Sequence, residues 1–282
     1  MRKVLAAIVL LLSLLPVAFA DGGMRNCLPV GDLREETLAF RDGEKLDFSV
    51  HYKWGAINAD VARAQLSLEK TTMNGQSVFH AAISGRVLKF YEMFFKVRES
   101  LDSWFSTDTF VPLRFNRDSR EGNYTLTNRS SFAWHGGVGV VTANMKTSRK
   151  GHFSFQKEIG ACTLDIPTMF FLLRNVDMSR IEKDKSYPLS FIMDSDVYTL
   201  HFRYLGDEEK NIPEVGKVSC MKFGFEVVAG DVFSGDSDLY CWLSDDGNRI
   251  PVYFSAPLKI GEVRGRLIEY SGLKHPFKAL RK

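Results

Sequence analysis

The stretch LDFSVHYKWGAINADVARAQLSL, residues 46–68, alternates apolar and polar side chains along two successive segments. In residues 46–54 every second position is apolar, from Leu46 to Trp54, and the positions between are polar. Residues 62–69 repeat the alternation, and Gly55 begins the break between the two segments. A period of two over such lengths is typical of strands with one buried face. The stretch therefore predicts an antiparallel β-hairpin.

The same alternation recurs along the rest of the chain. It is clearest in residues 79–83, 124–134, 138–145, 198–204, 220–227, 239–243 and 250–254. Gly136-Gly137 and the run 245–248 are turn signals between neighbouring segments. Half-buried antiparallel strands at short spacing predict an all-β fold, either an antiparallel sandwich or an incompletely closed β-barrel.

Two segments depart from this period and predict one or two short helices. Apolar residues recur at helical spacing in residues 87–95 and again in residues 169–176. The second segment has Asp165 near its N-cap and Pro167 in its first turn, where a missing N–H costs nothing. The aromatic stripe Phe90, Tyr91, Phe94 and Phe95 in the first segment is predicted to lie in the core, because large apolar patches are seldom left exposed.

The N-terminus has the three-part layout of a secretory signal peptide. Arg2 and Lys3 precede an apolar run over residues 4–15, and Ala18-Phe19-Ala20 ends it with small residues at a cut site. The run is short for a membrane span, although an uncleaved anchor is the alternative. We expect a signal peptide over 1–20, an extension over 21–39, a single β-rich domain over 40–273 and a basic tail over 274–282. Met24-Arg25-Asn26 before Cys27 disfavours lipidation.

Charge and cysteine content indicate which partners and which compartment to expect. Beyond residue 20 the chain carries 35 basic and 34 acidic residues, interleaved, so no basic stripe points to nucleic acid. Four cysteines would enter an oxidising compartment, where disulfides form. Cys220 and Cys241 lie on consecutive predicted strands and are the first candidate disulfide, with free buried thiols as the alternative.

The sequence lacks the residue spacings of well-known catalytic and metal sites. The six histidines and four cysteines show no short ligand spacing, which disfavours zinc. Gly235-Asp236-Ser237 superficially matches an esterase motif, and Asp231, Asp236 and Asp238 could offer oxygen ligands to calcium. A Gly/Asp/Ser-rich turn explains both patterns better. We therefore expect no metal, no cofactor and no catalytic residue that the sequence can name.

One polar cluster is a candidate ligand-binding site. Arg98, Ser100 and Asp102 alternate along a predicted strand and would share one face, with Trp104 next on it. If that face is concave it could bind a ligand, whereas local ion pairs on an exposed face are the alternative. The candidate ligand-binding residues are Trp54, Arg98, Ser100, Asp102 and Trp104.

Three stretches of the chain share their motifs with a known family. They are GEKLDFSVHYKWGAINADVARAQL, VRESLDSWFSTDTFVPLRFNRDSREGNY and WLSDDGNRIPVYFSAPLKIGEVRGRL, which together span roughly residues 40–270. Motif positions match at Gly43, Glu44 and Leu46, at Trp54, Gly55 and Ile57, and at Asp246, Arg249, Pro251 and Val252. In these residues the chain resembles an exported bacterial family, domain of unknown function 3108. The resemblance implies an exported β-rich envelope protein, most simply a periplasmic one, with no assigned catalytic residue.

These observations favour a non-enzymatic, soluble periplasmic protein. Its curved sheet would bind an apolar or amphipathic envelope component such as a lipid or glycolipid, because aromatic residues make up 12% of the chain and the strands could enclose a cavity. We expect no nucleic-acid partner and no stable membrane insertion. The alternative is a hydrolase of cell-wall or glycan material using acids such as Glu99, Asp102 or Asp118. An outer-membrane barrel is disfavoured by the Ala-Leu-Arg-Lys end.

Overall fold

The computed structural model describes residues 27–94, 96–228, 239–258 and 261–281. The first half of the chain forms β1 Lys45–Trp54, β2 Ile57–Met73, β3 Gln76–Val87, η3 Tyr91–Met93, β4 Val97–Ser106, β5 Pro112–Glu121, β6 Tyr124–His135, β7 Val138–Thr147 and β8 Gly151–Gly160. The second half forms β9 Thr163–Leu164, α2 Ile166–Leu173, η4 Met178–Arg180, β10 Ser186–Met193, β11 Asp196–Ile212, β12 Gly216–Val228, β13 Leu239–Ser244, β14 Pro251–Pro257, β15 Glu262–Ser271 and β16 Leu280–Arg281.

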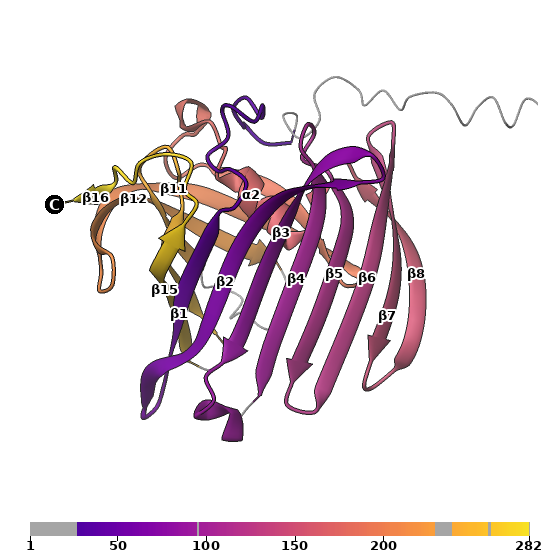
Figure 1. Cartoon of the computed structure of the whole chain (residues 1–282), viewed down its shortest axis with the longest axis horizontal. Coiled ribbons are helices and arrows are strands. Elements are labelled where there is room, and N and C mark those ends of the chain that lie inside the picture. The colour runs from indigo at the N-terminus through magenta and orange to yellow at the C-terminus, as the bar shows by residue number, and fades with distance from the viewer. Residues whose placement is uncertain (1–26, 95, 229–238, 259–260, 282) are drawn as a thin grey trace, which may run out of the picture.

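These strands form one curved sheet that is nearly closed into a barrel (Figure 1). Its path runs from β8 back to β1, crosses to β15 and continues back to β9, while β16 pairs beside β12. Neighbours along the path are antiparallel except β9 and β10, which are parallel. One seam is left unsealed, between β8 and the β9–β10 edge. Of the two folds predicted from the alternation, a sandwich or an incompletely closed barrel, the barrel is thus confirmed. The predicted hairpins β1–β2, β6–β7 and β13–β14 are confirmed as well.

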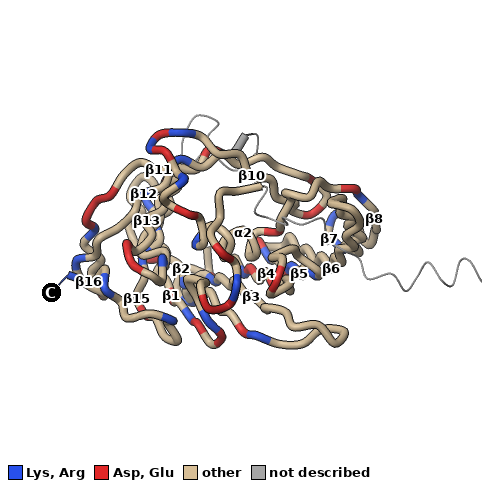
Figure 2. The backbone as a smooth tube through the Cα atoms, turned by 90° about the horizontal axis from the view of Figure 1, so that it is seen from above, with Lys and Arg blue, Asp and Glu red and all other residues tan. Residues whose placement is uncertain are grey.

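Helix α2 lies inside the ring of strands, as Figure 2 shows from above. Its sequence IPTMFFLL is apolar on every side, and a helix of this kind is stable only when it is buried. Asp165 caps it by accepting a hydrogen bond from the Thr168 N–H at 2.9 Å, as the sequence predicted. Its Phe171 packs edge-on against Phe40, with ring centroids 4.8 Å apart, and joins a fully buried aromatic cluster. The cluster comprises Phe40, Phe79, Phe105, Phe110 and Phe171.

The helix closes one end of the barrel, which we call the helix end. The opposite end, the distal end, carries the turns at residues 55–56, 88–96, 122–123 and 148–150 (Figure 1). These are the turns β1–β2, β3–β4, β5–β6 and β7–β8.

Segments that the sequence places outside the β domain also pack onto it. Within residues 27–40, Leu28, Val30 and Leu38 are buried in the main core. In the basic tail, Lys274 Nζ donates to three carbonyl oxygens of residues 35–38 at 2.6 to 2.9 Å, and β16 pairs with β12. Both segments therefore belong to the folded body.

The disulfide joins Cys27 to Cys162, and Cys220 and Cys241 are free thiols. The predicted Cys220–Cys241 pair is wrong, although β12 and β13 do pair as a hairpin. Cys220 lies opposite Ser244, three positions from Cys241 along β13. An odd offset puts the two side chains on opposite faces of the sheet, where no bond can join them.

The aromatic stripe was predicted to lie in the core, and this prediction is also wrong. The segment forms only the 3₁₀ turn η3, in which Phe90 is 67% and Phe94 is 73% exposed. Phe95 lies outside the described residues, as do the signal peptide and the acidic turn with Asp231, Asp236 and Asp238.

Candidate functional site

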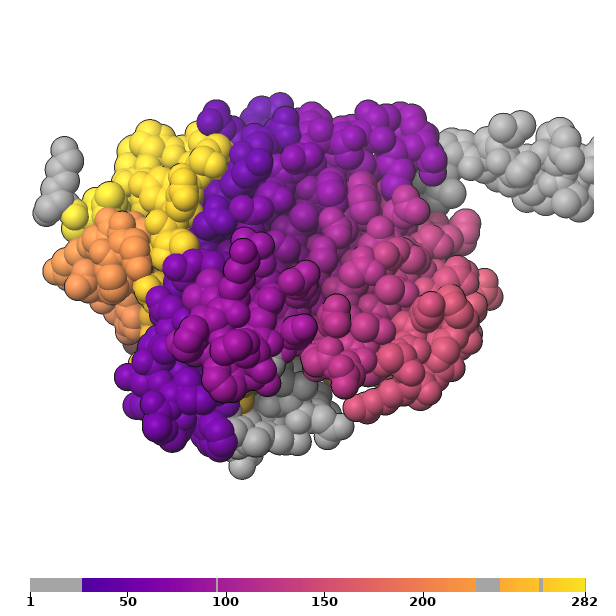
Figure 3. All heavy atoms as spheres, turned by 60° about the horizontal axis from the view of Figure 1, so that its bottom comes forward, coloured from indigo at the N-terminus to yellow at the C-terminus, as the bar shows by residue number. Residues whose placement is uncertain are grey.

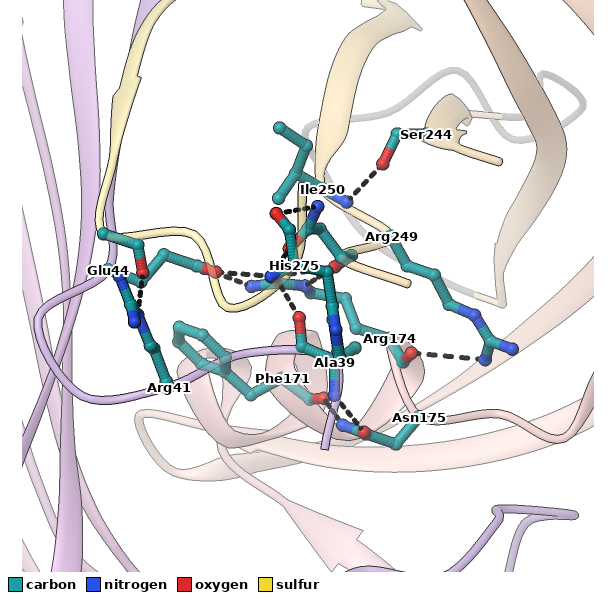
Figure 4. Close-up of polar contacts among 12 residues, drawn as sticks. Ala39, Arg41, Glu44, Phe171, Arg174, Asn175, Ser244, Arg249, Ile250 and His275 are labelled. Carbon is teal, nitrogen blue, oxygen red and sulfur yellow. Dashed lines mark hydrogen bonds and ion pairs between the residues drawn. The ribbon is translucent and has the colours of Figure 1, made fainter. Parts of the chain in front are cut away.

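A buried ion pair organises the helix end (Figure 4). Arg174, the C-cap of α2, and Glu44, just before β1, are both 1% exposed at their side chains. Arg174 Nη2 donates to Glu44 Oε2 at 2.9 Å and to the Asn248 carbonyl at 2.8 Å. Its guanidinium also lies over the rings of Phe40 and Phe171. A buried arginine needs such full pairing, so this cluster is part of the architecture.

The turn between β13 and β14 completes the same cluster. Asp246 Oδ1 accepts from the Asn248 N–H at 2.9 Å and shapes the turn, while Arg249 Nη1 donates to the Arg174 carbonyl at 3.3 Å. Glu44, Asp246 and Arg249 are motif positions of the resemblance drawn from the sequence, and the fold brings all three together around Arg174. A cavity of about 610 Å³ opens beside them, bordered also by Asp32, Asp177 and His275.

On β1, β3 and β4 the inward face of the sheet is buried near the helix end and partly exposed near the distal end. Along β1 the exposed fraction is 0% at Leu46 and 6% at Phe48, whereas Val50 and Tyr52 are partly exposed and Trp54 is 53% exposed. On β3, Phe79 and Ala81 are buried, but Ile83 is partly exposed. On β4, Leu101 is buried, whereas Glu99, which lies nearer the distal end, is partly exposed. Val50, Tyr52, Ile83 and Glu99 are thus inward side chains that stay partly exposed near the distal end, and we call this group of side chains the distal recess.

Apolar side chains also stand exposed on the turns beside this recess. Trp54 and Ile57 flank the β1–β2 turn, at 53% and 38% exposure. Phe90, Met93 and Phe94 occupy the β3–β4 connection, at 67%, 78% and 73%. Figure 3, which brings the distal end forward, shows both turns on the same face of the molecule. Several large apolar side chains exposed together mark a binding surface more often than chance.

An inward-facing ion-pair network lies beside the recess, formed by residues of β4, β5, β6 and the β10–β11 turn. Arg117 on β5 donates from Nε to Glu99 at 2.6 Å and from Nη1 to Asp194 at 2.5 Å. Asn128 on β6 reaches the other oxygen of Asp194 at 3.4 Å. Burial raises the pKa of the Asp194 carboxyl, although Arg117 opposes the shift. One guanidinium thus binds both carboxylates.

Four of the five predicted ligand-binding residues lie on the outer face of β4. Arg98, Ser100, Asp102 and Trp104 share that face, because Leu101, Ser103 and Phe105 between them are buried inward. A hydrogen bond with His80 holds the pKa of Asp102 below its ordinary value, and Ser100 also donates to Asp102, at 3.1 Å. Trp104 stacks on His80, with centroids 4.3 Å apart. Trp54 is not brought to this group, since it lies at the end of β1.

The three candidate acids do not converge. Glu99 points inward to Arg117, while Asp102 and Asp118 lie on the outer face and bind His80 and Arg129. Within the described ranges, no three histidine, cysteine or acidic side chains are grouped as a metal site would require.

The residues that sequence reasoning missed are three outer-face arginines near the distal end, which lie beside the predicted Arg98 of β4. They are Arg63, Arg86 and Arg120, one on each of β2, β3 and β5. Each occupies a polar position of its strand pattern, which was visible in the sequence. Their alignment depends on the register between strands, which a single sequence does not define.

These features define a mostly β protein, a nearly closed barrel with a buried helix and a disulfide. The chain belongs to the family described as Protein of unknown function (DUF3108), whose model matches residues 47–268. The family expected from the sequence motifs is therefore confirmed.

The fold is similar to a crystal structure from Brucella abortus, described as a beta-barrel-like protein of domain of unknown function DUF1849. The two share 10% sequence identity with a TM-score of 0.52, over 84% of this chain and 100% of the other. Among curated proteins, none matches the chain.

Two further findings concern the helices and the cysteines. Among the helices that the structure describes, none is long and apolar enough to cross a membrane. The Cys27–Cys162 disulfide suggests an oxidising location outside the cytoplasm, because such bonds are rare where thiols are kept reduced.

Proposed function

We propose that the protein is exported to the periplasm and there binds an apolar or amphipathic envelope component, such as a lipid or glycolipid, in the distal recess. The supporting observation is the loss of burial along the inward faces of β1, β3 and β4 toward the distal end. Ligand sites in proteins are concave and mostly apolar, with a few polar groups. Val50, Tyr52 and Ile83 supply the apolar wall of this recess, and Glu99 supplies a polar group.

The β1–β2 and β3–β4 turns add exposed apolar side chains at the surface beside the recess. Trp54, Phe90 and Phe94 would contact the part of an acyl chain that emerges from the barrel. Burying one such aromatic side chain contributes about 1.5–3 kcal/mol, so a few contacts of this kind suffice for retention during purification.

Native mass spectrometry of the gently purified protein, combined with solvent extraction, tests the proposal. We expect an added mass that the extraction identifies as a lipid. Val50→Lys with Ile83→Lys would place charges in the recess and release the ligand, because burying an unpaired charge against an apolar ligand costs free energy. Val138→Lys, at a 46% exposed position at the start of β7, is the matched control and should keep it. A wild-type protein that is always empty would overturn the proposal.

A further inference from the structure

Four arginines lie side by side on the outer face of the sheet. The strand register pairs Arg63 with Arg86, Arg86 with Arg98, and Arg98 with Arg120. Directly paired residues point to the same face, and neighbouring strands are about 4.8 Å apart. We call this set the arginine row: it crosses β2, β3, β4 and β5, and its cations follow one another at strand spacing.

The protein itself neutralises little of this charge. All four side chains belong to exposed residues. Arg98 binds one carboxylate, Glu92, at 3.1 Å, whereas Arg63 donates to the Ser49 hydroxyl and Arg120 to the Gly122 carbonyl at 3.5 Å. Arg86 has no ion-pair partner among the residues that the structure describes. Like charges directly opposite each other destabilise a sheet, so folding alone does not account for the row.

A groove runs along the row. It has a volume of about 400 Å³, and Arg63, Arg86 and Arg98 line it together with Asp47, Ala64, Gln65, Ser84 and Gly85. Gln65 and Ser84 add neutral hydrogen-bonding groups on the same outer face. The carboxylate in the groove, Asp47, already accepts a hydrogen bond from Gln65 at 2.9 Å.

From this geometry we infer that the arginine row binds a ligand that presents several phosphate groups in line. Guanidinium groups pair with phosphates through two parallel hydrogen bonds, and successive arginines at strand spacing suit successive anionic groups. The phosphates come either from membrane lipid headgroups or from a soluble polyphosphate chain. The exposed Lys89 and Lys96 on the adjoining β3–β4 connection continue the positive surface toward Phe90 and Phe94. This site is separate from the distal recess, since it lies on the outer face.

Binding measurements with two probes test the inference and distinguish the sources. Binding of inorganic tripolyphosphate would indicate a soluble phosphate chain as the ligand. Binding to vesicles of equal parts phosphatidylglycerol and phosphatidylethanolamine would indicate lipid headgroups, and phosphatidylcholine vesicles serve for comparison. We expect Arg86→Gln with Arg98→Gln to weaken binding by about fivefold per arginine. Arg41→Gln with Arg114→Gln removes the same charge from exposed positions outside the row and should leave binding unchanged.

The thermal midpoint of the same variants separates binding from a structural role. Removing like charges should leave the midpoint of the Arg86/Arg98 variant unchanged or higher, whereas a structural row would lose stability. The lipid extracted from the recess should be the same in this variant and the wild type, so the proposed function is tested separately. The inference is wrong if the wild type binds neither probe at physiological salt, or if both double variants bind equally.

Discussion

Asp165 lies fully buried inside the barrel, where it begins α2. Its carboxyl accepts hydrogen bonds from Ser103 and from the Thr168 N–H, yet burial raises its pKa to about 6. The folded protein therefore holds this proton more tightly than the unfolded chain, whose pKa is 3.8. The stability that the neutral carboxyl contributes is fully present below about pH 4 and is lost as the pH rises through about 6.

Asp165→Asn should remove this pH dependence and keep the cap, because asparagine caps helices as well as aspartate does. The wild-type free energy of unfolding, relative to that of the variant, should fall by about 3 kcal/mol between about pH 4 and about pH 7. Urea unfolding across this range measures it.

Asp177→Asn is the matched control, since Asp177 begins η4 in the same way. A hydrogen bond from Ser179 holds the pKa of this exposed carboxyl below its ordinary value. The difference from wild type should then change with the opposite sign as the pH rises. Parallel stability curves for wild type and Asp165→Asn would contradict the account.

At the scale of elements, the disulfide ties the N-terminal segment to the end of β8. Cys27 precedes the core residues Leu28 and Val30, and Cys162 lies between β8 and β9, beside the unsealed seam. The bond closes a separation of 135 residues, so it restricts the unfolded chain strongly.

Alkylation under denaturing conditions without reductant should modify Cys220 and Cys241 and spare Cys27 and Cys162. Peptide mapping by mass spectrometry reads the result, and alkylation after reduction, which should modify all four, is the control. Replacing Cys27 and Cys162 with serine should lower the free energy of unfolding by about 2–5 kcal/mol. Modification of Cys27 without reductant would disprove this pairing.

The β3–β4 connection shows why local pattern misled at this scale. Apolar residues at helical spacing predicted a buried face, but only Tyr91–Met93 form a helical turn. Backbone hydrogen bonds of this turn return to Leu88 and Lys89, and among the described residues Phe90 and Phe94 stay largely exposed. Helical spacing of apolar residues shows which side chains lie on one face of a helix. Whether that face is buried depends on another element that packs against it, and the sequence does not identify that element.

At the scale of the whole molecule, the open seam is bridged by side chains. The β10–β11 turn carries Asp194, which binds Arg117 and Asn128 of the opposite wall, and Lys157 on β8 donates to the Ser195 carbonyl. These contacts replace the ladder of hydrogen bonds that would seal a closed barrel.

Asp194→Asn with Lys157→Met should loosen the seam. Asparagine tolerates the positive φ of 54° at position 194, so the backbone of the turn is kept while the ion pair is lost. Hydrogen exchange should become faster at β8 and β10 and stay unchanged at the sealed β1–β15 junction, because strand edges open locally. Lys146→Met, at an exposed position on β7, is the control. Unchanged protection of β8 would contradict the bridging role.

Much of the fold was predictable, because a half-buried strand shows its face by alternation. The hairpins β1–β2, β6–β7 and β13–β14 and the capped helix α2 all follow from local pattern, which also narrowed the fold to a sandwich or an incompletely closed barrel. The shared face of Arg98, Ser100 and Asp102 was predictable for the same reason. That this face is the outer one was not, because curvature and closure depend on how distant strands pair.

Local sequence pattern was enough to predict many of the strands, the helix start at Asp165 and the family to which the chain belongs. The tertiary structure alone decided which cysteines bond, that Glu44 meets Arg174, and that four arginines from four strands form one row. The physical reason is that local pattern encodes the direction of each side chain, whereas register and closure bring together residues far apart in the chain.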